Sequence, residues 1–151
     1  MQDLKEKTTT TLSSLIIINN DRYEGYKTAA EETDDADLKY LFARLAMQSK
    51  GFSSELRKLI PFTEEGPDRD ETTISGKFYR VWMDIKSALT AKDRKGILAS
   101  CEFGEDAAKK TYDDVLKNTE NISSELLSII RKQRVELQQE HDNVKALRDK
   151  A

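Results

Sequence analysis

Apolar residues recur at alternating intervals of four and three through four long stretches of the chain. This spacing places them on one side of a helix, as in helices that pack into a bundle. The pattern predicts long helices at about residues 4–33 and 38–60, a third that follows Thr90 and extends to about residue 117, and a fourth that follows the polar residues 118–124 and extends to about residue 149. A shorter helix is predicted at about residues 74–89, where aromatic and aliphatic residues also return at helical spacing. The sequence therefore predicts an all-α protein.

Local sequence signals mark the start of the second helix, its end and the loop that follows it. Three aspartates, Asp34, Asp35 and Asp37, stand directly before that helix and can cap and charge its first turn. Pro61 ends the helix, because proline lacks the N–H that a continuing helix needs. Residues 61–71 are rich in glycine, proline and acidic residues, and we expect a loop there.

The segment 61–91 is long enough to cross the molecule between its first and second halves. Thr90 and Asp93 have the spacing of a capping box, with Asp in place of the usual Glu, and are predicted to open the next helix. A short turn, a long crossover and a second short turn form the connectivity of ferritin-like bundles. We therefore expect one domain, residues 1–151, folded as a ferritin-like up-down four-helix bundle with an additional short helix in the crossover.

A polar residue interrupts each of the four long apolar stripes. The four interruptions are Asn19, Ser49, Glu105 and Gln133. Counted from the turns at about 1.5 Å per residue, they lie roughly 20–24 Å from the same end of the bundle. Buried polar groups cost stability unless they find partners. Four such groups at one depth predict either a shared hydrogen-bond layer or a metal site.

Composition and charge narrow the range of functions. The chain has 151 residues and a formal net charge of −3, which gives no global field for nucleic acid. Its single cysteine excludes an intramolecular disulfide framework. No run approaches the ~18 consecutive apolar residues of a membrane helix, so no membrane span is expected. The first residues carry mixed charge without the apolar core of a signal peptide, so we expect a cytoplasmic protein.

Several segments carry a family resemblance, and the string Glu102-x-Gly104-Glu105-Asp106 is its most specific part. The segments are Asn20–Glu31, Val81–Leu89, Cys101–Asp106 and His141–Asp142. Together they resemble a small bacterial family of ferritin-like domains whose function is unknown. The resemblance covers nearly the whole chain. It implies a ferritin-like bundle and a bacterial cytoplasmic protein, and it implies no particular activity.

The ligands of a ferritin-like di-iron centre are incomplete in this sequence. Such a centre takes a Glu from each of two helices and a Glu-x-x-His pair from each of the other two. The chain has a single histidine, His141, and Gln138 stands three residues before it. Hard ligands gather instead in the second half of the chain. The metal-binding candidates are Glu102, Glu105, Glu136 and His141.

Each candidate also has a purely structural interpretation. Glu105 can be held by Gln133 and Asn19, or it can reach Lys109 at the edge of its stripe. The other two glutamates can pair with basic residues. His141 can pair with a carboxylate and so hold two helices together.

The leading hypothesis is a non-enzymatic structural, stress-associated or interaction module without a cofactor, in which the polar layer sets helix register. The alternative is a divergent ferritin-like protein that holds one iron or manganese ion through the four candidate ligands. Lipid association by bundle opening is a third possibility, but no helix combines a strongly basic face with an aromatic-rich one. Trp82 either docks the crossover helix or contributes to an interface with a second copy or another protein.

Overall fold

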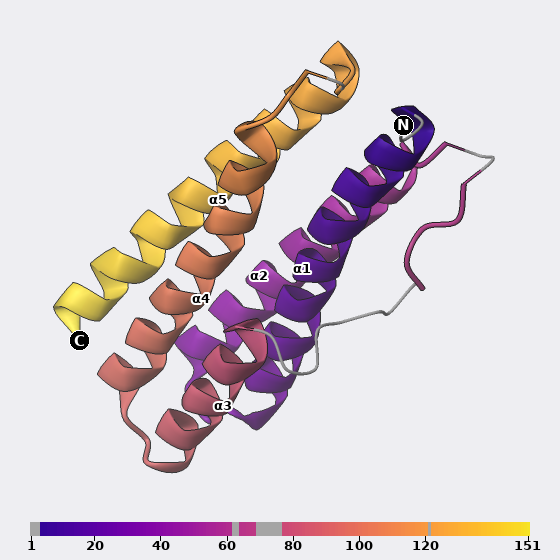
Figure 1. The fold of residues 1–151 in the computed structure, drawn as a ribbon. Helices are drawn as coiled ribbons and strands as arrows, with labels where there is room; N and C mark the ends of the chain where they lie inside the picture. Colours follow the sequence, from indigo (N-terminus) through magenta and orange to yellow (C-terminus); the bar gives the residue numbers. More distant parts are fainter. Residues whose placement is uncertain (1–3, 62–63, 69–76, 121) are drawn as a thin grey trace.

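The computed structural model describes residues 4–61, 64–68, 77–120 and 122–151. The helices there are α1 (Leu4–Glu32), α2 (Ala36–Arg57), α3 (Lys77–Thr90), α4 (Arg94–Leu116) and α5 (Ser124–Lys150) (Figure 1). Within the described ranges no residue forms a strand, so the all-α prediction is confirmed. The four long helices lie where the apolar pattern predicts them. The start predicted for the short helix, residues 74–76, lies outside the described residues.

Aspartate side chains begin two of the long helices. Asp35 caps α2 by accepting hydrogen bonds from the backbone N–H groups of Asp37 at 2.9 Å and Leu38 at 3.2 Å. Asp93 caps α4 by accepting from the N–H of Gly96 at 3.0 Å. The capping box predicted at residues 90 and 93 is therefore wrong, because Thr90 is the last residue of α3 and Asp93 is itself the N-cap of α4. Its hydroxyl donates back to a carbonyl of its own helix.

The sharp turn between α3 and α4 depends on Lys92. This residue has a φ of 57°, in the left-handed region that glycine usually occupies at the end of a helix. The N–H of Lys92 donates to the carbonyl of Leu89 at 3.1 Å, and that of Asp93 donates to Ala88 at 2.9 Å. These two bonds satisfy carbonyls that the end of a helix otherwise leaves without partners.

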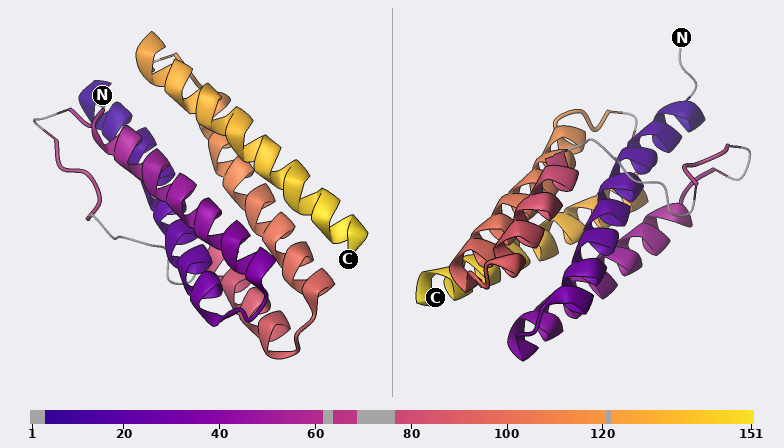
Figure 2. Two further views of the ribbon diagram at one scale, coloured as in Figure 1. Left: turned by 180° about the vertical axis from the view of Figure 1, so that it is seen from behind. Right: turned by 90° about the horizontal axis from the view of Figure 1, so that it is seen from below.

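Two antiparallel helical hairpins, α1–α2 and α4–α5, form the main body, and α3 packs against α4 and α1 (Figures 1 and 2). The α1–α2 and α3–α4 turns lie at one end of the molecule, where Arg94 Nη1 lies 2.7 Å from Asp35 Oδ2. We call this the α1–α2 end. The α4–α5 turn lies at the opposite end, beside the start of α1, and we call it the α4–α5 end.

The apolar core has two parts, one toward each end. The part at the α1–α2 end includes Tyr26, Phe42, Leu45, Val81, Ile85, Leu98 and Val144. The part at the α4–α5 end includes Leu12, Leu15, Leu56, Ala108, Tyr112, Ile130 and Leu137. Val81 and Ile85 come from α3, and Trp82 packs partly buried beside them, so α3 is docked by its apolar face. Buried polar residues separate the two parts of the core.

All four predicted polar interruptions have a relative exposure of 0%. Asn19, Ser49 and Glu105 each fall between residues of the two core parts, and Gln133 lies within the part at the α4–α5 end. The expectation that all four are measured from the same end is wrong, because the two hairpin turns lie at opposite ends (Figure 1). The residues still lie at similar depths, since 20–24 Å is about half the length of a helix of this size.

None of the described helices has an apolar stretch that could cross a lipid bilayer.

Candidate functional site: a buried polar layer between the hairpins

A buried ion pair joins the two hairpins. Arg22 of α1 donates from Nη2 to Oε1 of Glu105 on α4 at 2.6 Å, and from Nε to Oε2 at 3.0 Å. Both side chains are 0% exposed. Arg22 Nη2 also donates to Oε1 of Gln48 on α2 at 3.2 Å. Two parallel N–H···O bonds between a guanidinium and a carboxylate are the strongest form of this pair.

Burial and the ion pair together shift the pKa values of the groups around it. Burial lowers the pKa of Arg22, but the carboxylate of Glu105, together with Tyr26 and Tyr112, more than offsets burial and leaves this pKa raised. Burial, and then the same carboxylate, raise the pKa values of Tyr26 and Cys101. The thiol of Cys101 therefore stays protonated at neutral pH, and a protonated thiol is a poor nucleophile. The guanidinium of Arg22 also lies 5.7 Å from the ring centroid of Tyr26.

A chain of hydrogen bonds passes through all four long helices. Asn19 Nδ2 on α1 donates to the hydroxyl of Tyr112 on α4 at 2.8 Å, and this hydroxyl donates to Gln133 Oε1 on α5 at 2.5 Å. Gln133 Nε2 then donates to Glu55 Oε1 on α2 at 2.8 Å. Every group donates in the same direction, so the chain ends on a carboxylate, which only accepts. Burial raises the pKa of Tyr112, which keeps its hydroxyl a donor at neutral pH.

We call the ion pair and this chain together the polar layer. Of the four predicted interruptions, Asn19 and Gln133 share the hydrogen-bond chain and Glu105 belongs to the ion pair. Ser49 joins neither, because its hydroxyl donates to the carbonyl of Leu45 in its own helix at 2.8 Å. A further pair at the α2–α5 contact, Arg44 with Glu140, also connects the hairpins.

The four predicted metal ligands do not come together. Glu105 is held by Arg22 rather than by Gln133, Asn19 or Lys109. Among the described residues, the group whose ligand atoms converge contains two of the four, Glu102 and His141, and adds Asp106. Glu136 is not a member of this group.

The His–carboxylate pair expected between two helices is present. His141 Nε2 on α5 lies 3.1 Å from Asp106 Oδ1 and 3.5 Å from Glu102 Oε1, both on α4. Glu102 also pairs with Arg148 of α5, as expected for a glutamate at the edge of its stripe.

The apolar pattern alone misses Arg22, the central residue of the layer. By residue type the apolar stripe of α1 would include the neighbouring Tyr23, which is only partly buried, whereas Arg22 is completely buried. The available signal is spacing: Arg22 stands three residues after Asn19 and four before Tyr26, which places all three on one helix face. The same rule identifies Asp106, four residues after Glu102.

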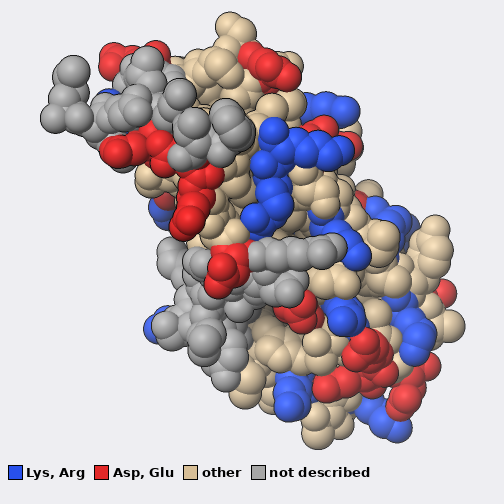
Figure 3. Space-filling model, turned by 90° about the vertical axis from the view of Figure 1, so that its right-hand side faces the viewer, with Lys and Arg blue, Asp and Glu red and all other residues tan. Residues whose placement is uncertain are grey.

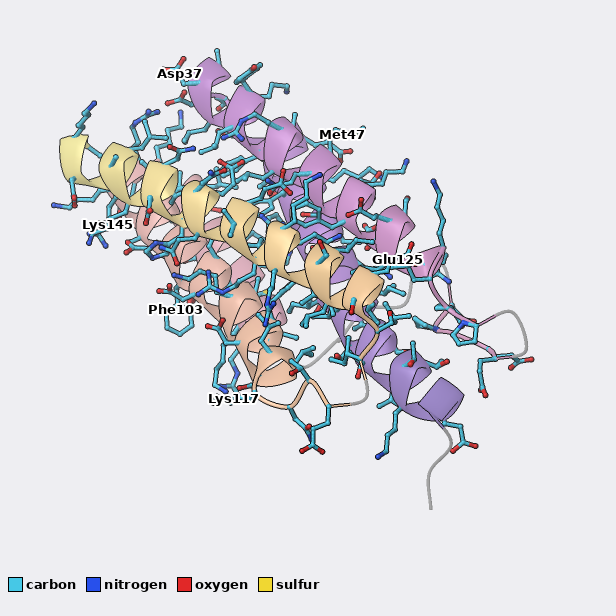
Figure 4. The ribbon with its side chains drawn as sticks, turned by 90° about the horizontal axis from the view of Figure 1, so that it is seen from above. Asp37, Met47, Phe103, Lys117, Glu125 and Lys145 are labelled. Carbon is cyan, nitrogen blue, oxygen red and sulfur yellow. The ribbon has the colours of Figure 1, made fainter. Side chains whose placement is uncertain are left out.

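The outer surface differs from this interior. Figure 3 shows Lys and Arg interspersed with Asp and Glu over one face, in keeping with the net charge of −3. Large apolar side chains are exposed singly. They are Tyr40 and Met47 on α2, Met83 on α3, Phe103 on α4 and Val135 on α5. Met47 and Phe103 project outward from their helices (Figure 4).

The fold and the site define a class of helical proteins in which two hairpins enclose a buried polar layer. A family model described as a domain of unknown function (DUF2383) matches residues 7–118. The chain therefore belongs to this family. The match covers α1 to α4 and ends before α5, which supplies Gln133, Glu140 and His141. None of the curated proteins compared matches the chain.

Proposed function

We propose that this protein is a non-catalytic structural module, a ferritin-like four-helix bundle with α3 in its crossover, in which the polar layer fixes the register of the two hairpins. The observation that carries the proposal is that each long helix contributes to one directed chain of hydrogen bonds. Sliding one hairpin by a helical turn, about 5.4 Å, would break every bond between them. Buried polar residues fix helix register in this way in coiled coils.

A di-iron or manganese centre in the interior does not fit these residues. Glu105 is the buried carboxylate that such a centre would use, and both of its oxygens accept from Arg22. A cation at that position would face the guanidinium at close range. We therefore favour the structural role over the alternative of an iron or manganese protein built on Glu102, Glu105, Glu136 and His141. The resemblance carried in part by Asn20–Glu31 leads us to propose, in addition, a bacterial cytoplasmic protein.

The experiment replaces the ion pair by apolar residues, as Arg22→Met with Glu105→Leu. An apolar pair of similar volume often preserves or increases stability. If the pair sets register, the double variant stays helical but gives more than one set of amide resonances in its ¹H–¹⁵N spectrum. A single set of resonances with wild-type dispersion would remove the basis for the proposal. Asp114→Leu with Lys117→Met, an exposed ion pair at the end of α4 and outside the groove described below, is the matched control and keeps a single set.

The second part of the proposal is an interaction role, with a second copy of this chain as the partner. The groove between α3 and α4, which has a volume of about 420 Å³, is the surface that we assign to this contact. Phe103, which is 62% exposed, lies in its lining. The lining also carries two basic residues, Arg80 and Lys110, and two acidic ones, Asp84 and Asp106. A two-fold axis can place each basic residue of one copy near an acidic residue of the other, which gives a self-complementary interface.

Sedimentation velocity over a range of concentrations tests this interface. We expect the wild-type chain to dimerise and Phe103→Asp to remain monomeric with an unchanged helical circular dichroism spectrum. Val135→Asp is the control, because Val135 is also exposed, at 56%, but lies outside the groove. A wild-type chain that stays monomeric, or a Phe103→Asp variant that still dimerises, would contradict the interaction role.

A further inference from the structure

A second cluster of ligating side chains lies where α4 contacts α5, outside the polar layer. Glu102 and Asp106 are four residues apart on α4 and so project from one face of that helix. His141 faces them from α5. One ligand atom from each of the three residues lies within 4.8 Å of the others. The side chains of His141 and Glu102 are only 12% and 14% exposed, whereas that of Asp106 is 52% exposed and leaves the cluster open to solvent.

The distances suit a metal ion as well as a hydrogen bond. Neighbouring ligands that each lie about 2.1 Å from an ion are about 3.0 Å apart in octahedral geometry and about 3.4 Å apart in tetrahedral geometry. His141 Nε2 lies 3.1 Å from Asp106 Oδ1 and 3.5 Å from Glu102 Oε1. An ion could therefore bind between these atoms with small side-chain movements.

A further carboxylate outside the cluster orients the imidazole. His141 Nδ1 lies 3.1 Å from Asp142 Oδ1, and Gln138 Nε2 donates to the same oxygen at 3.0 Å. When Nδ1 carries the proton and donates it to Asp142, the lone pair of Nε2 points to Glu102 and Asp106. Metal-binding histidines are characteristically held in this way, with the other ring nitrogen donating to a carboxylate.

Two cations also contact the cluster. Arg148 pairs with Glu102, and Lys109 Nζ lies 3.1 Å from Asp106 Oδ1. The side chain of Arg148 is 28% exposed and that of Lys109 is 13% exposed. An incoming divalent ion would compete with these two cations for the carboxylates, so removal of Arg148 should favour metal binding.

We propose that Glu102, Asp106 and His141 bind one divalent transition-metal ion at the α4–α5 surface. One imidazole nitrogen with two carboxylates suits Zn²⁺ and its first-row neighbours better than Mg²⁺, which prefers oxygen ligands throughout. Three protein ligands leave at least one coordination position open to water. This site is independent of the register role, because it uses none of the residues of the polar layer.

The test titrates untagged, chelator-treated full-length protein with Zn²⁺ by calorimetry, with Mg²⁺ as the comparison. Co²⁺ serves as a second probe, since its visible absorption reports bound nitrogen and oxygen ligands. We expect one Zn²⁺ per chain. His141→Gln and Asp106→Asn each remove a ligand and should weaken Zn²⁺ binding by at least about tenfold. Asp142→Asn removes the carboxylate that orients His141 and should weaken binding by about tenfold or more. His141→Gln should also abolish the Co²⁺ absorption band.

Two further variants make the assignment specific. Glu136→Gln changes a carboxylate on the same helix as His141 but outside the cluster, and it should leave the Zn²⁺ affinity unchanged. Arg148→Met should increase the affinity. Circular dichroism confirms that each variant is folded. The proposal is wrong if the wild-type chain shows no saturable one-to-one Zn²⁺ binding, or if binding survives unchanged in both His141→Gln and Asp106→Asn.

Discussion

The sharpest prediction concerns the charge of Glu105. Glu105→Gln keeps the shape of the side chain but removes the negative charge that faces Arg22. The guanidinium then stays in the interior without a counter-charge, with both original side chains of the pair at 0% exposure. One Gln oxygen can still accept from Arg22, whereas the new amide nitrogen faces another donor.

The expected loss can be worked out from the contacts. Glu105 accepts two charge-assisted hydrogen bonds, at 2.6 and 3.0 Å. Each such bond contributes about 1.5–3 kcal/mol, and breaking a buried ion pair from one side typically costs about 3–5 kcal/mol. We therefore expect Glu105→Gln to lower the free energy of unfolding by about 3–5 kcal/mol. For a chain of this size, that corresponds to a fall in Tm of about 6–20 °C.

Urea unfolding measures this loss through circular dichroism and through the fluorescence of Trp82. Asp114→Asn is the control, because Asp114 pairs with Lys110 on the exposed surface, and it should leave the unfolding midpoint unchanged. Arg22→Met should be destabilising to a similar degree, and the double variant with Glu105→Leu should recover most of the loss. A Glu105→Gln variant within about 1 kcal/mol of wild type would refute the reasoning, because no buried charge would then have lost its partner.

Three smaller predictions test other parts of the fold. Asp35→Ala removes the N-cap of α2 and its contact with Arg94, so thermal unfolding should show a loss of about 1 kcal/mol, with the exposed Asp34→Ala as a nearly neutral control. Lys92→Gly relieves the left-handed backbone at the α3–α4 turn, and the free energy of unfolding should rise by about 0.5–1 kcal/mol; a decrease would contradict the strain. Burial raises the pKa of Tyr112 from its usual value of 10.0, so the folded chain keeps a proton that the unfolded chain loses. Stability should therefore fall as pH rises above about 10, and urea midpoints in Tyr112→Phe should fall less steeply over that range.

The periodicity of apolar residues predicts the helices well because one buried face per helix is a local property of the sequence. Asp35 begins the second helix for an equally local reason, whereas that helix ends at Arg57, before it reaches Pro61. The prediction for Thr90 was wrong because residue type alone does not distinguish an N-cap from the last residue of a helix. The two differ only in backbone conformation. Lys92, which makes the turn, carries no sequence signal, since the left-handed region is typical of glycine.

The polar layer is predictable in part. Asn19, Glu105 and Gln133 stand out because each interrupts an apolar stripe, and the structure buries all three. Their partners are not local: Arg22 and Glu105 are 83 residues apart in the sequence. The direction in which each hairpin runs decides which residues face one another, and a count from the turns cannot supply that direction. The sequence analysis missed Arg22, the central residue of the layer, because a charged residue is expected at the surface unless its buried partner is known.

The most direct test of the register role measures a distance between the hairpins. Spin labels at two exposed positions, Ala43→Cys on α2 and Ser128→Cys on α5, in a Cys101→Ser background, report that distance by double electron–electron resonance. With the polar layer intact, we predict one narrow distance distribution. With Arg22→Met and Glu105→Leu added, we predict a broadened distribution or a second one displaced by about 5.4 Å, one helical turn. An unchanged narrow distribution in that variant would contradict the claim that the buried polar layer sets how the hairpins pair.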